Sequence, residues 1–311
     1  MNKKHSGKKG FLEISFGWLF AIIVGAFILF LAIYLAVRLI DLESTSQNVE
    51  ASKEIGVLLN PLETSFQEST ATVLGMGDEA RIYTTCAEFG LFGEQRIRVA
   101  RKNFGGWKDT GISVSLENKF IFSESPVEGG NFFLFSKPLE MPFKVTDLTY
   151  LIPTDAEYCF VNPPSEISSD VESLNLNINS SERLSACPQN SVTVCFDGGD
   201  CDVDVNMQSK TVRKDSLVYF EGEALMYAAI FSSSGDYECQ LTRIMKRVSS
   251  LSDIYIEKQT IIARENCNSN LDLSLIRNQA ESFGDSSDLE RFFTVSEEIF
   301  NQNRRADCRI W

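Results

Sequence analysis

Three aspartates that alternate along the chain, Asp200, Asp202 and Asp204, are the residues whose spacing best suits metal chemistry. They match the first three ligand positions of an EF-hand calcium loop. Val205 stands where that loop requires glycine, and Thr211 stands where it requires a bidentate glutamate, so the segment is no EF-hand. In a strand the three carboxylates would share one solvated face, and calcium binding of another kind is the alternative.

Histidine chemistry is excluded from most of the chain, because the only histidine is His5, near the N-terminus. A serine–histidine–aspartate triad, a cysteine–histidine pair and an HExxH zinc site all need an imidazole at the reacting centre. Chemistry by carboxylates or by lysine stays open, but no carboxylate pair can be assigned to glycoside hydrolysis without a distance between the two groups. We predict no catalytic residue and no cofactor.

Eight cysteines offer a different kind of chemistry, since an even number in a translocated region is typical of a disulfide framework. Cys195 and Cys201 bracket a glycine-rich turn. Cys267 and Cys308 flank two short helices that would run out and back, so we predict these two pairs. Reduced, buried thiols in a cytosolic protein of the opposite orientation are the alternative. The other cysteines are Cys86, Cys159, Cys187 and Cys239.

The aspartates and cysteines lie in elements that come after a predicted membrane anchor in the chain. The segment Ile14–Val37 contains 24 residues and no charge, and a helix that rises about 1.5 Å per residue crosses a bilayer core of about 30 Å at that length. We assign residues 11–38 to one transmembrane helix. Four lysines lie in the tail of residues 1–10, and the positive-inside rule places this tail in the cytoplasm. The C-terminal domain would be extracellular.

Two details of the N-terminal region bear on assembly. Gly17, Ala21 and Gly25 recur every four residues and would let a second helix approach closely, although such residues are common in membrane helices. The junction of Gly10 and Phe11 looks like the cleavage site of a type IV prepilin. Those signals carry a glutamate at the fifth mature position, whereas Glu13 would be third, so an uncleaved signal anchor is the alternative.

Residues 39–77 are helix-compatible and predict a helical stalk, with Pro61 as a break or kink. Alternating apolar residues and glycine-rich turns predict an antiparallel β-rich extracellular domain over residues 78–221. Within it, residues 162–190 are rich in proline, serine and asparagine and predict a surface loop. This loop carries the only N-glycosylation sequon, at Asn179.

Two hairpins are predicted near the end of the β-rich domain. The first joins Ser191–Phe196 to Asp202–Met207, and the second joins Lys210–Val212 to Leu217–Phe220.

A basic stretch precedes these hairpins. Arg96, Arg98 and Lys102 would share one face of a strand. We expect them to pair with neighbouring carboxylates, and an anion-binding patch is the alternative.

The last part of the chain, residues 222–311, predicts helices. Apolar residues at heptad spacing predict a long helix over residues 237–265, with Asp236 as its N-cap. Such a helix could pack on its own domain or form an intermolecular coiled coil. Two shorter helices, about Leu271–Phe283 and Ser287–Asn303, would follow. The expected fold class is α+β, with a single N-terminal transmembrane helix and stalk, a β-rich ectodomain and a C-terminal helical segment.

The charge of the chain limits its partners. The formal net charge is −14 although the N-terminal tail is basic, and such an acidic ectodomain repels nucleic acid. The expected partners are the lipid bilayer and either another envelope protein or a second copy, through the transmembrane or C-terminal helices.

Six segments carry a family resemblance: Gly10–Gly17, Tyr158–Pro164, Val194–Phe196, Met226–Phe231, Tyr237–Arg247 and Cys267–Asn270. Together they resemble an uncharacterised family of membrane-anchored archaeal proteins from small-genome lineages, with a type IV pilin-like N-terminus. The resemblance implies an archaeal cell envelope and supplies no activity. The sequence thus favours an anchored, non-catalytic envelope protein for binding or assembly. A pilin-like filament subunit and a histidine-free envelope hydrolase are the alternatives.

Overall fold

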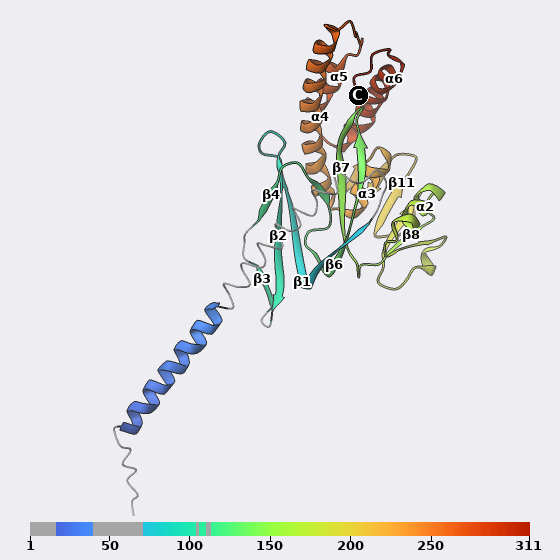
Figure 1. The fold of residues 1–311 in the computed structure, drawn as a ribbon. Helices are drawn as coiled ribbons and strands as arrows, with labels where there is room; N and C mark the ends of the chain where they lie inside the picture. Colours follow the sequence, from blue (N-terminus) through green and yellow to red (C-terminus); the bar gives the residue numbers. More distant parts are fainter. Residues whose placement is uncertain (1–16, 40–70, 104–105, 110–112) are drawn as a thin grey trace, which may run out of the picture. The chain divides into compact units, whose positions relative to one another are not determined.

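The computed structural model describes residues 17–39, 71–103, 106–109 and 113–311, in two units that span residues 1–47 and 48–311. The described residues of the first unit form one helix, Gly17–Leu39, which is long and apolar enough to cross a membrane (Figure 1). A membrane anchor and a signal sequence both have such a helix near the N-terminus. The tail 1–10, the Gly10–Phe11 junction and residues 40–70 of the predicted stalk lie outside the described residues.

The predicted stalk is wrong at its C-terminal end, because Thr72–Gly77 belong to the strand β1 (Thr72–Ala87). Leu74 and Met76 are buried while the residues between and around them are exposed, which is the two-residue period of a strand. The first residues of β1 pair with β6 (Val127–Glu140). This long-range pairing overrides a local composition that is compatible with a helix.

The first sheet, sheet A, has seven strands in the order β3-β2-β1-β6-β7-β5, with β4 paired to β2. All of its pairings are antiparallel except that of β5 with β7, as expected for a β-rich domain. Its other strands are β2 (Glu94–Asn103), β3 (Gly106–Asp109), β4 (Val114–Leu116), β5 (Phe120–Phe122) and β7 (Lys144–Pro153).

Sheet A curves so that β5, at one end of the strand order, returns to β1 and β2. The buried amide of Gln95 on β2 makes two hydrogen bonds to the backbone of Ile121 on β5, accepting from its nitrogen at 2.8 Å and donating to its oxygen at 2.7 Å. The hydroxyl of Thr84 on β1 lies 3.0 Å from that of Ser123. These contacts close the sheet over a small apolar core that includes Ile82 and Phe132.

The second sheet, sheet B, has six strands in the order β13-β12-β11-β10-β8-β9. The predicted hairpin of residues 191–207 is wrong, because β10 and β11 run parallel. Parallel pairing places Val194 beside Val203 and Phe196 beside Val205, and all four side chains are buried. The second predicted hairpin is the antiparallel pair β12 and β13. The strands are β8 (Tyr158–Val161), β9 (Ile178–Ser181), β10 (Val192–Phe196), β11 (Val203–Asn206), β12 (Thr211–Arg213) and β13 (Leu217–Tyr219).

The predicted surface loop of residues 162–190 is also wrong. It contains the helix α2 (Ser165–Leu174), the strand β9 and a short 3-10 turn, Leu184–Ala186. Ile167, Val171 and Leu174 are buried at helical spacing within a stretch that is otherwise polar. The strand β9 pairs parallel to β8, so the segment β8–α2–β9 is a βαβ unit. The expectation of antiparallel pairing therefore fails in three of the five pairings of sheet B.

The helical region contains four helices and a 3-10 turn, Ser286–Asp288. The N-cap of the long helix α4 is Ser233 rather than the predicted Asp236: the hydroxyl of Ser233 accepts from the nitrogen of Asp236 at 3.2 Å. The first half of the heptad pattern, including Leu241 and Val248, is buried in the protein's own core. The helices are α3 (Gly222–Phe231), α4 (Ser234–Ala263), α5 (Leu273–Glu281) and α6 (Leu289–Arg305).

One apolar core joins both sheets to the helices. It includes Phe135 of sheet A, Phe160 of sheet B, Phe231 of α3, Ile244 of α4 and Phe292 of α6. The helix α3 is buried on all sides, which explains its apolar sequence. In Figure 1, α4, α5 and α6 gather beside one another at one end of this unit. The helical region is therefore part of the same compact unit as the sheets.

Candidate functional site

The three aspartates that suggested calcium are not gathered into one group with the geometry of metal ligands. The carboxylate of Asp202 accepts hydrogen bonds from both the nitrogen and the hydroxyl of Thr193, each at 2.8 Å. These bonds hold the pKa of the Asp202 carboxyl below its usual value. Asp204 lies within β11, and Asp200 precedes the strand. No group of three or more histidine, cysteine, aspartate or glutamate side chains suited to a metal ion occurs among the residues that the structure describes.

All eight cysteines lie in disulfide pairs. Cys195 pairs with Cys201 and Cys267 with Cys308, the two pairs predicted from the sequence, at Cα separations of 5.7 Å and 5.5 Å. Two further pairs join residues that the sequence did not connect. They are Cys159–Cys187 in sheet B and Cys86–Cys239 between β1 and α4.

The basic stretch of β2 pairs with carboxylates, as expected. Arg98 lies 3.1 Å from Asp109, and Arg96 and Lys102 form ion pairs with Glu94 and Glu79. These charges lie at the surface, where such pairs contribute little to stability.

Two other predicted features are exposed. Asn179 of the sequon is exposed on β9, where its amide donates to Glu157 at 2.7 Å. Gly17, Ala21 and Gly25 are exposed on the N-terminal helix, and a side chain at either glycine would meet no atom within 4 Å.

Lysine chemistry has a buried candidate in Lys137 on β6, which with Lys119 is one of two buried lysines among the described residues. Its ammonium lies 2.8 Å from Asp170 of α2 and 2.9 Å from Glu223 of α3. The hydroxyl of Tyr227 donates to the second oxygen of Asp170 at 2.8 Å. The ammonium is thus engaged by carboxylates from two different helices. The cluster therefore ties three elements together at the edge of a 470 Å³ hollow rather than presenting a nucleophile.

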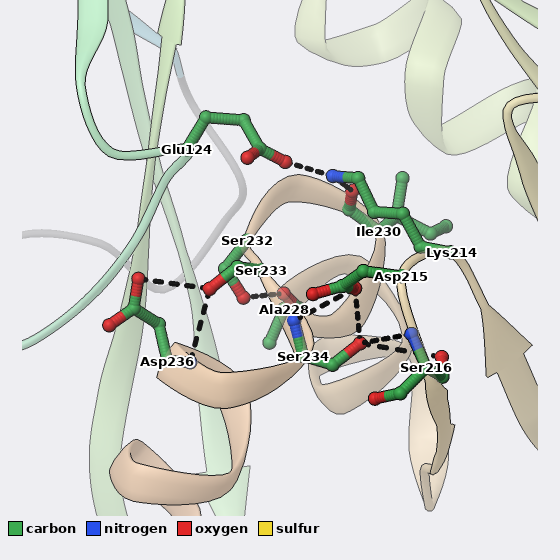
Figure 2. A network of polar contacts seen from close by, with 10 residues as sticks. All are labelled: Glu124, Lys214, Asp215, Ser216, Ala228, Ile230, Ser232, Ser233, Ser234 and Asp236. Atoms are coloured by element: carbon green, nitrogen blue, oxygen red, sulfur yellow. Dashed lines mark hydrogen bonds and ion pairs between the residues drawn. The ribbon is translucent and has the colours of Figure 1, made fainter.

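Serine chemistry has a candidate at the corner between α3 and α4 (Figure 2). Figure 2 shows Ser234 directed at Asp215, with its hydroxyl 2.5 Å from the carboxylate. Burial opposes ionisation of Asp215, but the hydrogen bonds from the Ser234 side chain and from the backbone of Asp215, Ser234 and Ser216 together outweigh burial and hold the pKa of the carboxyl below its usual value. A carboxylate of lowered pKa is a weak base, and a serine nucleophile needs a base to take its proton. The corner is thus a turn fixed by hydrogen bonds.

The most unusual surface is the loop between β1 and β2, residues Glu88–Gly93, which we name the apolar loop. Phe89 is 88% exposed and Leu91 is 76% exposed, the highest values among the large apolar side chains that the structure describes. Turns between strands are usually polar, and exposed apolar side chains that gather in one place mark interaction surfaces. Figure 1 shows this loop beside α4.

The helix α4 fixes the base of the apolar loop. Arg243 donates to the backbone oxygen of Phe92 at 3.2 Å, and Lys246 donates to that of Glu88. The disulfide Cys86–Cys239 lies just before the loop. Gly93 closes it with a φ of 62°, and a Cβ there would lie 2.9 Å from the side chain of Arg243. The two exposed side chains are therefore held out by a rigid base, which reduces the entropy lost on binding.

A hollow of about 410 Å³ lies next to the apolar loop. Leu91 forms one wall, and Met245 of α4, Ala280 of α5 and Phe283 just after α5 form the other apolar parts of its lining. The remaining lining residues are polar or charged: Thr242, Lys246, Ser249, Ser250 and Glu281. Sequence reasoning missed this surface, since the run Phe89–Gly93 resembles the end of a strand. The signal was an apolar sequence between two glycines, where a polar turn is the rule.

The stability of this unit is expected to depend on pH through half-buried carboxyls near the start of α4. Burial raises the pKa of Asp236 and of Glu238. A carboxyl whose pKa is higher in the folded protein binds its proton more tightly there, so protonation favours folding. The free energy of unfolding should therefore rise as pH falls from neutral toward the ordinary values of 3.8 for aspartate and 4.5 for glutamate.

Urea unfolding of the full chain in detergent, at about pH 5 to 7, measures this rise. The substitution Asp236→Asn mimics the protonated group and should make the rise smaller. Glu257→Gln, at an exposed position of the same helix, removes the same charge and serves as the control. An equal effect of both variants would assign the rise to net charge alone. Below the ordinary carboxyl range, stability should fall again as groups of lowered pKa such as Asp215 take up protons.

Comparisons with protein-family models, with curated proteins and with solved structures give no match for this chain. Its function must therefore be inferred from the surfaces and clusters described above.

Proposed function

We propose that the chain is a membrane-anchored protein of the cell envelope whose ectodomain binds a partner protein through the apolar loop. The observation that carries this proposal is the exposure of Phe89 and Leu91 on a base fixed by Arg243, Lys246 and a disulfide. Rigid aromatic anchors of this kind supply most of the binding energy of protein interfaces. The role is non-catalytic, since the lysine and serine candidates are both engaged in structural contacts.

The position of the loop supports this role. The described part of the ectodomain begins at residue 71, next to Thr72, and the apolar loop follows Ala87 at the other end of β1. β1 contains 16 residues, and its pairing with β6 shifts register between Gly75 and Ala80. The loop thus follows the opposite end of this strand from the residue at which the described part of the unit begins. The lysines of the tail and the four disulfides support an ectodomain outside the cytoplasm.

A photo-crosslinking amino acid at position 89 of the full chain, in the membranes of the expressing cells, tests this function. Position 217 is the matched control, because Leu217 is an apolar residue that is 42% exposed on β13. We expect protein adducts from position 89 and none from position 217. Adducts with lipid alone, or no adducts at position 89, would contradict a protein partner.

A filament subunit is the second candidate function. It is favoured by the exposed helix face of Gly17, Ala21 and Gly25, where a second helix could approach closely. Prepilin processing would remove the first ten residues, so the mature chain would begin at Phe11. Mass spectrometry of the protein from membranes would exclude this function by finding residues 1–10 still attached.

A further inference from the structure

The apolar loop and the hollow beside it form one surface that carries both a projection and a cavity. Phe89 projects from the loop, and the hollow begins at Leu91, two residues along the chain. A two-fold dimer interface must be complementary to itself, because the same patch of each copy meets the other. A surface with an adjacent projection and cavity satisfies this condition.

The sizes and polarities of the two features match. Hollows of about 300–1,000 Å³ hold drug-sized ligands, so the 410 Å³ hollow has room for an aromatic side chain. Met245 and Phe283 form an apolar part of its mixed lining, and both kinds of side chain pack well on aromatic rings.

The charges beside the hollow also suit a second copy. Lys246 and Glu281 both line it and carry opposite charges. In a two-fold arrangement, Lys246 of one copy can face Glu281 of the other in two equivalent places. Such complementarity at the edge of an interface fixes orientation more than it adds affinity.

We propose that two copies of this chain associate through the apolar loop, with Phe89 of each copy inserted into the hollow of the other. This inference rests on the proposed function, since it names the protein that the loop binds. A bilayer surface accounts for an exposed phenylalanine but gives no role to the hollow or to the paired charges. Anchoring in one membrane would raise the effective concentration of the copies for each other.

Complementation between two variants tests the proposal. Phe89→Ser removes the projection and keeps the hollow, while Ser249→Phe fills the hollow and keeps the projection. Each variant alone loses both of the symmetric contacts and should weaken self-association of the full chain by about a thousandfold, the effect of losing two interface contacts worth about 2 kcal/mol each. A mixture of the two variants restores one of the two contacts and should form mixed dimers. Leu217→Ser is the control and should associate like the unaltered chain.

Sedimentation velocity of the purified full chain in a density-matched detergent, with a fluorescent tag on one variant, measures these states. Mixed dimers from two variants that are each monomeric would support the proposal, because no lipid or third protein is present. Dimers that persist in Phe89→Ser, or an unaltered chain that stays monomeric, would overturn it. If position 89 still gives protein adducts in membranes, the loop binds a different protein and only this inference fails. If it gives none, the proposed function fails with it.

Discussion

Replacing Arg243 with methionine is expected to lower the free energy of unfolding by about 3–5 kcal/mol. Arg243 is fully buried on α4, and its guanidinium lies over the ring of Phe120 at 4.8 Å. It donates to Gln240 at 2.6 Å and to four backbone oxygens. These are the oxygens of Phe92, Leu116, Glu117 and Lys119.

The cost arises from the carbonyls that the substitution leaves without a donor. Each unpaired buried acceptor costs about 1–3 kcal/mol, and relief from burying a charge offsets part of the sum. Burial lowers the pKa of the Arg243 guanidinium to about 10, so the group stays charged at neutral pH. The substitution Arg243→Lys is expected to restore little of the lost stability. The three donors of lysine share one nitrogen atom and cannot reach both the carbonyl of the β1–β2 loop and those of the segment after β4.

Urea unfolding of the full chain in detergent measures this loss. Arg247→Met is the matched control one turn along α4, where the side chain makes one backbone bond, to Val145 at 2.9 Å. The control should lose about 1 kcal/mol. A loss for Arg243→Met no larger than that of the control would mean that water or rearranged donors satisfy the freed carbonyls.

Arg243 also illustrates what the sequence could and could not predict. The periodicity around it placed the long helix within three residues of its observed start, because Leu241, Ile244 and Val248 recur at helical spacing. The strand β2 was found for a similar reason, since buried Ile97 and Val99 alternate with exposed charges. Local patterns suffice where a segment has one apolar face.

Long-range partners were not predictable in this way. The carbonyls that Arg243 satisfies lie more than 120 residues earlier in the chain, and an arginine between apolar helix positions gives no sign that it will be buried. The parallel pairing of β10 with β11 was missed because two strands joined by a short glycine-rich segment are usually a hairpin. The helix α2 was missed because only three of its residues are buried, and the rest of its sequence is polar.

The candidate site also separates into what a local motif predicts and what long-range contacts decide. The sequence directed attention to Asp200, Asp202 and Asp204, whose spacing matches a known motif, but the tertiary structure engages Asp202 with Thr193. The apolar loop has no motif. Its proposed role follows from exposure, and its base is fixed by Cys239 and Arg243, which are far from it in sequence.

Removing the disulfide Cys86–Cys239 is expected to cost about 5 kcal/mol of unfolding free energy, the largest effect of any disulfide in this chain. The cost grows with the length of chain that a disulfide closes, because the cross-link restricts the unfolded state. Cys86 and Cys239 are 153 residues apart. By contrast, Cys195 and Cys201 are six residues apart, and the same relation gives about 2 kcal/mol for that pair.

The two pairs therefore form a matched comparison, with both cysteines of each pair replaced by alanine in the full chain. Urea unfolding in detergent, followed by the fluorescence of Trp107 and Trp311, measures both losses. The double variant of Cys86 and Cys239 should be the less stable by about 3 kcal/mol. Equal losses would mean that the contacts of Arg243 and Gln240 already hold β1 against α4 without the cross-link. Since the same disulfide lies at the base of the apolar loop, its loss should also make Phe89 and Leu91 less rigid and weaken binding through that loop.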